Sequence, residues 1–527
     1  MRRLICNYLK IIFRSPLYRL AYLFLLAAFS FFSVCFNFYL SDDTVNYFDG
    51  FQRMEYFEFA LYIVAFCMAV FFAQKPSLLE EICFVPRKKI CLSHLFASYL
   101  AAVTVLFIAW IYLTIGAVAE HVTIFYWLRT ILYASCRWGS ILSWMTTIGF
   151  FCGWIVTSKY AYLFSIPFTL LFSVFNHWIL CGRGTLGFEN CWFARLICLQ
   201  RVEIGSTSLV FRGPLLDAEM ASKTGFVLAL CAVFAALLYL ISQKRFRMRT
   251  VCVLCICLLC TGVCAGLYRQ LRPAVYDVYQ KLYPPIIAQS AVVRSYTGEI
   301  WMREWSAYSL DIEIEQASGT VVLRLDESIR VKELQVDQAS VSYQRVDDEL
   351  ILDAPADRFV LHIEASGRVS YFDFAGTRSI YTSVSGCCLP PNFAFLPSIG
   401  GDETEKEYDL TIHSVQTLAS NLNACANGTT YTIQDRGSTV CFFTGDLQTF
   451  THDGIRFIVA RYDMRQNEET YVASYREKNE YLTHMDPKTG EISQEAWGEM
   501  KTVFLLTYQT TGSFPTVFDD FALIPVS

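Results

Sequence analysis

The side chains that could carry out catalysis or bind a metal are scattered along this sequence. Of its seven histidines, no two stand four residues apart and none is followed by glutamate. The His-Glu-x-x-His motif, in which two histidines bind zinc and the glutamate is the general base, therefore does not occur. A Gly-x-x-x-x-Gly-Lys-Ser/Thr phosphate-binding loop does not occur either. We expect no catalytic residue, no metal ligand and no cofactor, and any ATP hydrolysis must come from another subunit.

Cysteines are the second reactive group. Five of them crowd residues 252–264, but in an apolar helix cysteine is usually a small packing residue, and these five would not share one face. Cys425 and Cys441 stand in the second half, where a disulfide could form if that half lies in an oxidising compartment. Their pairing would close a hairpin-sized loop. The spacing alone does not fix the connectivity, because Cys387 and Cys388 are in the same half.

Charges of both signs gather in the segment 75–92. Its acids, its second proline and its adjacent cations are Glu80, Glu81, Pro86, Arg87, Lys88 and Lys89. One interpretation is an amphipathic helix on the cytoplasmic face that docks into a cytosolic ATPase. The other is an ordinary cation-rich cytoplasmic loop, which charge alone favours.

Apolar segments dominate the first half. A helix needs about 20 apolar residues to cross a bilayer. We predict spans at about 20–40, 56–74, 93–117, 139–157, 161–180, 224–242 and 250–267. Residues 121–137 contain Arg129 and Arg137, so we expect an interfacial or re-entrant helix there. No ionisable residue falls in the middle of the spans at 93–117 and 224–242, which argues against a proton-coupled carrier.

The two halves carry opposite charge. Residues 1–267 have 22 Lys and Arg against 12 Asp and Glu, whereas residues 268–527 have 21 against 36. Cations concentrate before the first span and in the loops 75–92 and 243–249, so these segments are expected in the cytoplasm. Seven spans then place residues 268–527 outside the cell membrane. The bilayer is an expected partner and nucleic acid is not.

The second half alternates apolar and polar residues at 308–315, 320–325, 348–353 and 358–364, as half-buried strands do. We therefore predict a polytopic α-helical membrane domain of about seven spans followed by an all-β, antiparallel, sandwich-like domain. The expected boundaries are an interfacial helix over 1–19, the membrane domain over 20–267, a linker over 268–300, the β-domain over 301–465 and a final segment over 466–527.

The first half resembles the permease subunit of type-2 ABC exporters. The family has a basic helix ending like Phe13-Arg14-Ser15-Pro16, and a loop in which an acid precedes Pro and a cation, as Glu80 precedes Pro86-Arg87. The resemblance covers about 240 residues, and a seventh span departs from the usual six. It implies a cytosolic ABC ATPase and a second permease subunit, in a homodimer or heterodimer, as partners.

The second half resembles the N-terminal β-domain of the aminopeptidase N family. Residues 408–463 contain Tyr-Asp-Leu-Thr-Ile-His, then Leu-Ala-Ser-Asn, Asn427-Gly428 and an aromatic strand after Cys441. Residues 511–525 resemble the entry into that family's catalytic domain. The family's zinc motif and its Gly-x-Met-Glu-Asn strand are absent. No catalytic residue is carried over, so the domain is expected to be non-catalytic or part of a longer or split protein.

Taken together, these resemblances predict the membrane subunit of a bacterial ABC exporter, powered by a separate ATPase and carrying a non-catalytic peptidase-like β-domain. The rival predictions are a membrane-anchored, peptidase-like binding or scaffold protein and a fragment of a split zinc aminopeptidase. Neither the cargo nor the stoichiometry follows from the sequence.

Overall fold

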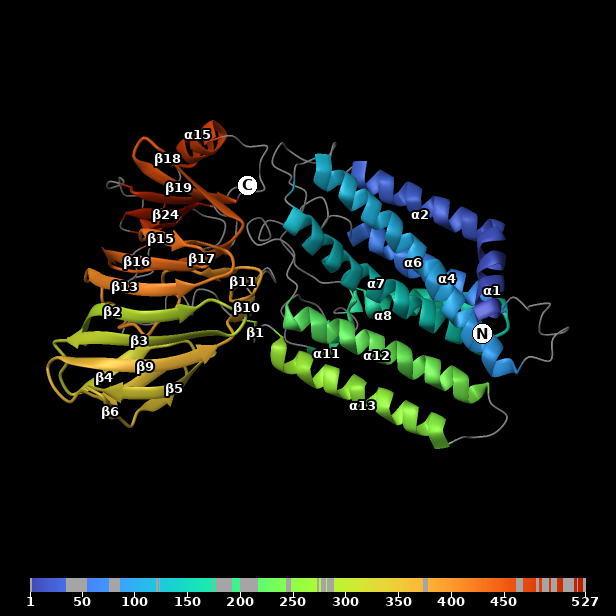
Figure 1. The fold of residues 1–527 in the computed structure, drawn as a ribbon, viewed down its shortest axis with the longest axis horizontal. Coiled ribbons are helices and arrows are strands. Elements are labelled where there is room, and N and C mark those ends of the chain that lie inside the picture. Colours follow the sequence, from blue (N-terminus) through green and yellow to red (C-terminus); the bar gives the residue numbers. More distant parts are fainter. Residues whose placement is uncertain are drawn as a thin grey trace. The chain divides into compact units, whose positions relative to one another are not determined.

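A computed structural model gives the fold in two compact units (Figure 1). The helical unit comprises Met1–Val202 and Ala218–Arg272, and the β-unit comprises Glu203–Asp217 and Pro273–Ser527. The structure describes residues 2–34, 55–74, 86–119, 122, 124–173, 175–176, 192–199, 217–242, 248–272, 274–275, 281, 289–372, 378–460, 468–479, 483–485, 492–493, 500–505, 516–518 and 520–524.

The helical unit is built from helices of 6 to 33 residues, and the longest of them are apolar. They are α1 (Arg2–Arg14), α2 (Pro16–Val34), α4 (Glu55–Gln74), α6 (Arg87–Ala119), α7 (Ile124–Ile155), η2 (Lys159–Phe164), α8 (Ser165–Phe172), α11 (Trp192–Ile197), α12 (Ala218–Ile241) and α13 (Met248–Leu271). The interfacial helix expected over 1–19 is shorter, because α1 ends at Arg14 and Pro16 begins α2. Helix α1 packs against α6, where the ring of Tyr8 stacks on His94 at 4.3 Å.

Two glycines let α4 and α7 approach closely. A β-carbon at Gly149 would lie 2.5 Å from the main-chain oxygen of Phe66, and one at Gly153 would lie 2.8 Å from that of Val70. Any larger side chain would push the helices apart. Glycines four residues apart on one helix face are the usual device for such contact between apolar helices.

A buried ion pair joins the same two helices. The Arg137 Nε lies 2.5 Å from Glu58 Oε1, and Trp138 Nε1 donates to the same carboxylate at 2.9 Å. Arg137 lies well inside α7, which runs without a break from residue 124 to 155. The prediction of a separate helix at 121–137 is therefore wrong. Glu58 supplies the counter-charge that makes burial of Arg137 tolerable.

The prediction of about seven spans is not supported. Among the described residues, three helices are long and apolar enough to cross a membrane, and they lie in α6, α12 and α13. A shorter apolar helix covers Glu58–Gln74. Where a span was predicted at 161–180, the described residues form η2 and the eight-residue α8.

The β-unit is organised around an eight-stranded sheet in the order β15-β16-β13-β2-β3-β9-β5-β6. Its strands are β2 (Val292–Trp301), β3 (Ser306–Glu315), β5 (Ile329–Val336), β6 (Ala339–Ser340), β9 (Phe359–Gly367), β13 (Lys406–His413), β15 (Ala424–Asn427) and β16 (Thr430–Gly437). All neighbours are antiparallel except β2 and β13, which run parallel. The predicted antiparallel sheet is thus confirmed with one parallel pair.

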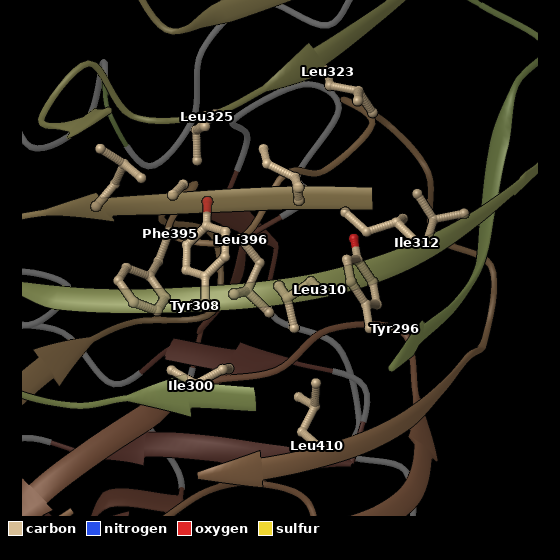
Figure 2. Close-up of a cluster of buried hydrophobic side chains, with 14 of the residues drawn as sticks. Tyr296, Ile300, Tyr308, Leu310, Ile312, Leu323, Leu325, Phe395, Leu396 and Leu410 are labelled. Atoms are coloured by element: carbon tan, nitrogen blue, oxygen red, sulfur yellow. The ribbon is translucent and has the colours of Figure 1, made fainter. Parts of the chain in front are cut away.

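The core of the β-unit follows from the period-two pattern. In β3, Tyr308, Leu310 and Ile312 are fully buried, while the residues between them are partly or fully exposed. Figure 2 shows these side chains gathered with Tyr296, Phe395 and Leu396. Burying one Leu or Ile side chain contributes about 1.5–3 kcal/mol, so this strand is a main source of stability.

Two smaller sheets complete this core. One has the order β4-β8-β7, and the other has the order β1-β10-β11-β12-β17-β14. Their strands are β1 (Ala274–Val275), β4 (Thr320–Arg324), β7 (Gln344–Val346), β8 (Glu349–Asp353), β10 (Ser370–Phe372), β11 (Arg378–Tyr381), β12 (Cys387–Leu389), β14 (Thr417–Ala419) and β17 (Phe442–Gly445).

The end of the chain forms a fourth, mixed sheet with its own core. Its order is β18-β19-β22-β24-β23-β20-β21. The elements are β18 (Leu447–His452), β19 (Ile455–Ala460), α15 (Glu468–Asn479), β20 (Thr483–Met485), β21 (Ile492–Ser493), β22 (Thr502–Leu505), β23 (Thr516–Phe518) and β24 (Phe521–Ile524). Tyr471 and Val472 of α15 pack with Phe457, Val459 and Val503.

Candidate functional site

Strand β15 forms one edge of the eight-stranded sheet. It pairs with β16 on one side only, and no other described strand pairs with it. Its residues Ala424, Cys425, Ala426 and Asn427 are uncharged, include no proline and are mostly exposed. Proteins usually protect such an edge with lysine, proline or a bulge, because its main-chain N–H and C=O groups can pair with another strand. This edge lacks those devices.

The turn that follows the edge strand is fixed by glycine. Gly428 has a φ of +66°, in the left-handed region that glycine adopts at little cost. The turn lies at Asn427-Gly428, between β15 and β16. On the far side of the turn, the Ser414 N–H donates to the Thr429 carbonyl at 2.9 Å. The edge strand therefore has a fixed end and a fixed register.

The turn that precedes the edge strand is held by Arg456 of β19. Its Nη2 donates to the carbonyl oxygens of Ser420 at 2.8 Å and Asn421 at 2.7 Å. It also bonds Thr502 Oγ1 at 3.1 Å, so one guanidinium joins the final sheet to this turn. A planar guanidinium with five donors suits a cluster of carbonyl oxygens. We call residues 420–423 with Arg456 the Arg456 latch.

Polar side chains complete the Arg456 latch. Asn421 Oδ1 accepts from the main-chain N–H of Cys441, and its Nδ2 donates to the Thr439 carbonyl, each at 2.9 Å. Asp435 Oδ2 accepts from both the main-chain N–H and the side-chain amide of Asn423. Burial raises the pKa of the Cys441 thiol to about 12. Cys441 is therefore a neutral packing residue at physiological pH.

The two faces of the edge strand differ in chemistry. Ala424 is opposite the buried Ile433, and Ala426 is opposite the buried Tyr431, so this face continues the core. Cys425 lies opposite Thr432 on the other, more polar face. A strand added at β15 would therefore place apolar side chains beside Ala426 and polar ones beside Cys425, because side chains alternate along a strand.

The residues predicted to couple to an ATPase are only partly described. Glu80 and Glu81 lie outside the described residues. Pro86 is exposed and precedes α6, and Arg87 is the first residue of that helix. Lys88 Nζ lies 5.8 Å from the centre of the Tyr239 ring in α12, and Lys89 is exposed. The described cations thus form the first turn of α6.

The structure does not join Cys425 to Cys441, the pair that the sequence offers for a possible disulfide. Cys425 and Cys441 are both free thiols, the first exposed on β15 and the second buried against Asn421. The register of β15 on β16 and the Asn421 contact hold the two thiols in different surroundings, which spacing alone does not reveal. Among the described residues, no group of three or more His, Cys, Asp or Glu side chains could hold a metal.

A buried charge cluster was missed by the sequence reasoning. Lys281, which is 4% exposed, bonds Asp326 at 2.9 Å and both oxygens of Asp348 at 2.7 Å. Burial opposes the charge, but attraction to Asp326 and Asp348 outweighs it and raises the pKa of Lys281. Tyr371 donates to Asp326 at 2.8 Å. The cluster fixes the start of the β-unit to its core. The one available signal was that Lys281 is the only lysine of the predicted linker 268–300.

The comparisons with known proteins return only distant likenesses. No protein-family model and no curated protein matches the chain. An M1 zinc metallopeptidase from Deinococcus radiodurans is 13% identical with a TM-score of 0.33, over 47% of this chain and 63% of that one. Native leukotriene A4 hydrolase from Saccharomyces cerevisiae is 9% identical with a TM-score of 0.30, over 49% of this chain and 44% of that one. The chain spans just under two thirds of the Deinococcus protein.

The chain is similar to members of the M1 peptidase family, the family that residues 408–463 resemble. No family model of a permease matches, and the predicted number of spans is not supported. The prediction of an ABC exporter permease is therefore wrong. A cytosolic ATPase and a second permease subunit were expected as partners only because of that prediction, so neither is proposed below. The rival prediction of a peptidase-like protein fits these findings better.

Proposed function

We propose that this chain is a membrane-anchored binding protein whose β-unit captures an extended polypeptide segment by adding it as a strand beside β15. The observation that carries the proposal is the edge itself, which is exposed, uncharged and free of proline. Strand addition obtains its affinity from main-chain hydrogen bonds and its specificity from alternate side chains. The segment would alternate apolar and polar residues to match the two faces of β15.

The site is fixed before any partner arrives. Gly428 fixes one end of β15, and the Arg456 latch fixes the other. Binding to a preformed edge orders only the incoming segment, so less conformational entropy is lost. The chain would act by binding rather than by hydrolysis, since its sequence holds no His-Glu-x-x-His motif.

The helical unit would supply the membrane anchor. Three of its described helices have the length and the apolar composition of membrane spans. Many of their side chains are exposed and apolar, among them Leu259 and Ile256 of α13. Such a surface suits lipid rather than water. The proposed location is a cell membrane with the β-unit outside.

The test uses the full chain in detergent and a synthetic peptide of alternating Val and Thr residues. Amide hydrogen exchange at 424–427 should slow when the peptide is present, and maleimide labelling of Cys425 should slow with it. The variant Cys425→Lys, which has no thiol to label, should abolish the slowing of amide exchange, because a lysine on an edge strand opposes pairing.

The matched control is Gln434→Lys, which adds the same charge to the neighbouring strand β16. Gln434 is exposed and lies beside Asp409, so the lysine is accommodated there and peptide protection should persist. Unchanged exchange at 424–427 with saturating peptide would refute the proposed edge. Equal loss of protection in both variants would show a charge effect unrelated to strand addition.

A further inference from the structure

Of the three chain connections between the units, the two that border α12 and α13 leave the β-unit at the same end. Arg368 follows β9 directly and pairs with Asp217 at 3.7 Å, and the next residue, Ala218, begins α12. At the other connection, β1 begins three residues after the last residue of α13 and pairs with Tyr371 and Phe372 of β10. Arg368 and β10 are almost consecutive in the chain.

Strand register places several loops at this end. Gly367, the last residue of β9, pairs with Ser306, the first residue of β3. Trp301 ends β2 and pairs with Ala307 and with His413, the last residue of β13. The loops 302–305 and 414–416 therefore emerge beside Arg368.

Hydrogen bonds tie a third loop to the same end. Thr382 Oγ1 donates to the Glu304 carbonyl at 3.0 Å, and Arg368 Nε donates to Glu304 Oε1 at 3.0 Å. Gln416 Nε2 donates to the Val384 carbonyl at 3.5 Å. Residues 302–305, 382–386 and 414–416 thus form one rim, which we call the connection rim.

The connection rim carries the most exposed large apolar side chains described in the β-unit. Trp305 is 53% exposed, Val384 is 54% exposed and Val415 is 83% exposed. The other exposed ones, such as Val360 at 40%, are less so. Arg303 is an exposed cation on the same loop as Trp305. Tryptophan and valine beside a cation are the composition of a surface that enters the headgroup region of a bilayer.

We propose that the connection rim docks into the lipid headgroup region, with Trp305, Val384 and Val415 as interfacial anchors and Arg303 paired with lipid phosphate. The proposal rests on the membrane anchoring proposed above, because α12 and α13 must enter the bilayer for this end to lie at its surface. The occupant is lipid rather than protein because the two connections lead directly into α12 and α13. These two helices are the most apolar of the described helices that could cross a membrane.

The test places photoreactive benzoylphenylalanine at position 305, 384 or 415 of the full chain in nanodiscs of phosphatidylcholine and phosphatidylglycerol. Illumination should yield lipid adducts at all three positions by mass spectrometry. The matched control is position 360, since Val360 is exposed on β9 but lies eight residues, or about 26 Å along the strand, from Arg368. It should give no lipid adduct.

A second control separates this proposal from the membrane anchoring on which it rests. Leu259 is 68% exposed on α13, so benzoylphenylalanine at position 259 should react with lipid. Adducts at 259 without any at 305 and 415 would overturn the rim proposal alone. Absence of lipid adducts at 259 as well would overturn both. Cross-links from 305 or 415 to protein in place of lipid would also overturn it.

Discussion

The guanidinium of Arg456 lies 2.7 Å from the main-chain oxygen of Asn421, 35 residues earlier in the chain. This contact links the final mixed sheet to the turn that begins the candidate binding edge. It also covers Cys441, whose Sγ lies 3.3 Å from Asn421 Oδ1. The thiol therefore reports whether the Arg456 latch is closed.

Arg456→Ala is expected to open the latch. Loss of the donors leaves the carbonyls of Ser420 and Asn421 without partners, which costs about 2 kcal/mol. Because 1.4 kcal/mol is a factor of ten, maleimide labelling of Cys441 should accelerate about thirtyfold. Arg436→Ala is the control, since Arg436 makes only an exposed ion pair with Glu407 and should change the rate little. An unaltered rate in Arg456→Ala would show that the latch does not hold this turn.

The buried lysine of the linker leads to a second expectation. Lys281→Met leaves the carboxylates of Asp326 and Asp348 without their cation, and removing one partner of a buried pair costs about 3–5 kcal/mol. Half-exposed Asp348 keeps water, so the lower end of this range is expected. Lys332→Met makes the same substitution at an exposed site and should be nearly neutral. Proteolysis of the full chain within 273–290 measures the effect. Equal resistance of both variants would contradict the proposed role of the cluster.

Much of the β-unit could be predicted because its signals are local. The alternation at 308–315 predicted β3, whose buried residues follow the same period of two. The Arg456 latch could not be predicted, because its members are far apart in the chain and none of them belongs to a motif. Spacing suggested a disulfide at Cys425 and Cys441, but strand register places only Cys425 on the open edge.

The helical unit was less predictable for a related reason. Arg137 was taken as incompatible with a continuous apolar helix, so 121–137 was separated from the next span. Glu58 lies 79 residues away and supplies the missing counter-charge. The apolar residues 161–180 likewise predicted one membrane span. In the structure α8 ends at Phe172, and the Leu199 N–H donates to the Phe172 carbonyl at 2.7 Å.

Alkaline pH should weaken the β-unit through Cys441. The pKa of this thiol is raised from 9.0 to about 12 in the fold, chiefly by burial. Between these values the unfolded chain releases a proton that the folded chain keeps, so the free energy of unfolding falls as pH rises, by about 1.4 kcal/mol per pH unit. The stability is fully present below pH 9.

The measurement is denaturant unfolding of the full chain between pH 9 and 10, below the ordinary pKa of tyrosine. Cys441→Ala should remove its share of the slope, although Cys387, whose pKa burial also raises, should retain its own. Cys425→Ala is the matched control, because Cys425 is exposed. Identical slopes in Cys441→Ala and Cys425→Ala would refute the assignment.

The buried pair of the helical unit allows a test by double substitution. Glu58→Met leaves Arg137 without its carboxylate, and Arg137→Met leaves Glu58 without its cation, so each alone should destabilise the full chain in detergent by about 3–5 kcal/mol. The double variant exchanges both charges for apolar side chains of similar length. It should be more stable than either single variant, because no uncompensated charge remains buried. Thermal unfolding followed by size-exclusion chromatography ranks the three, and additive losses would show that the two charges do not stabilise each other.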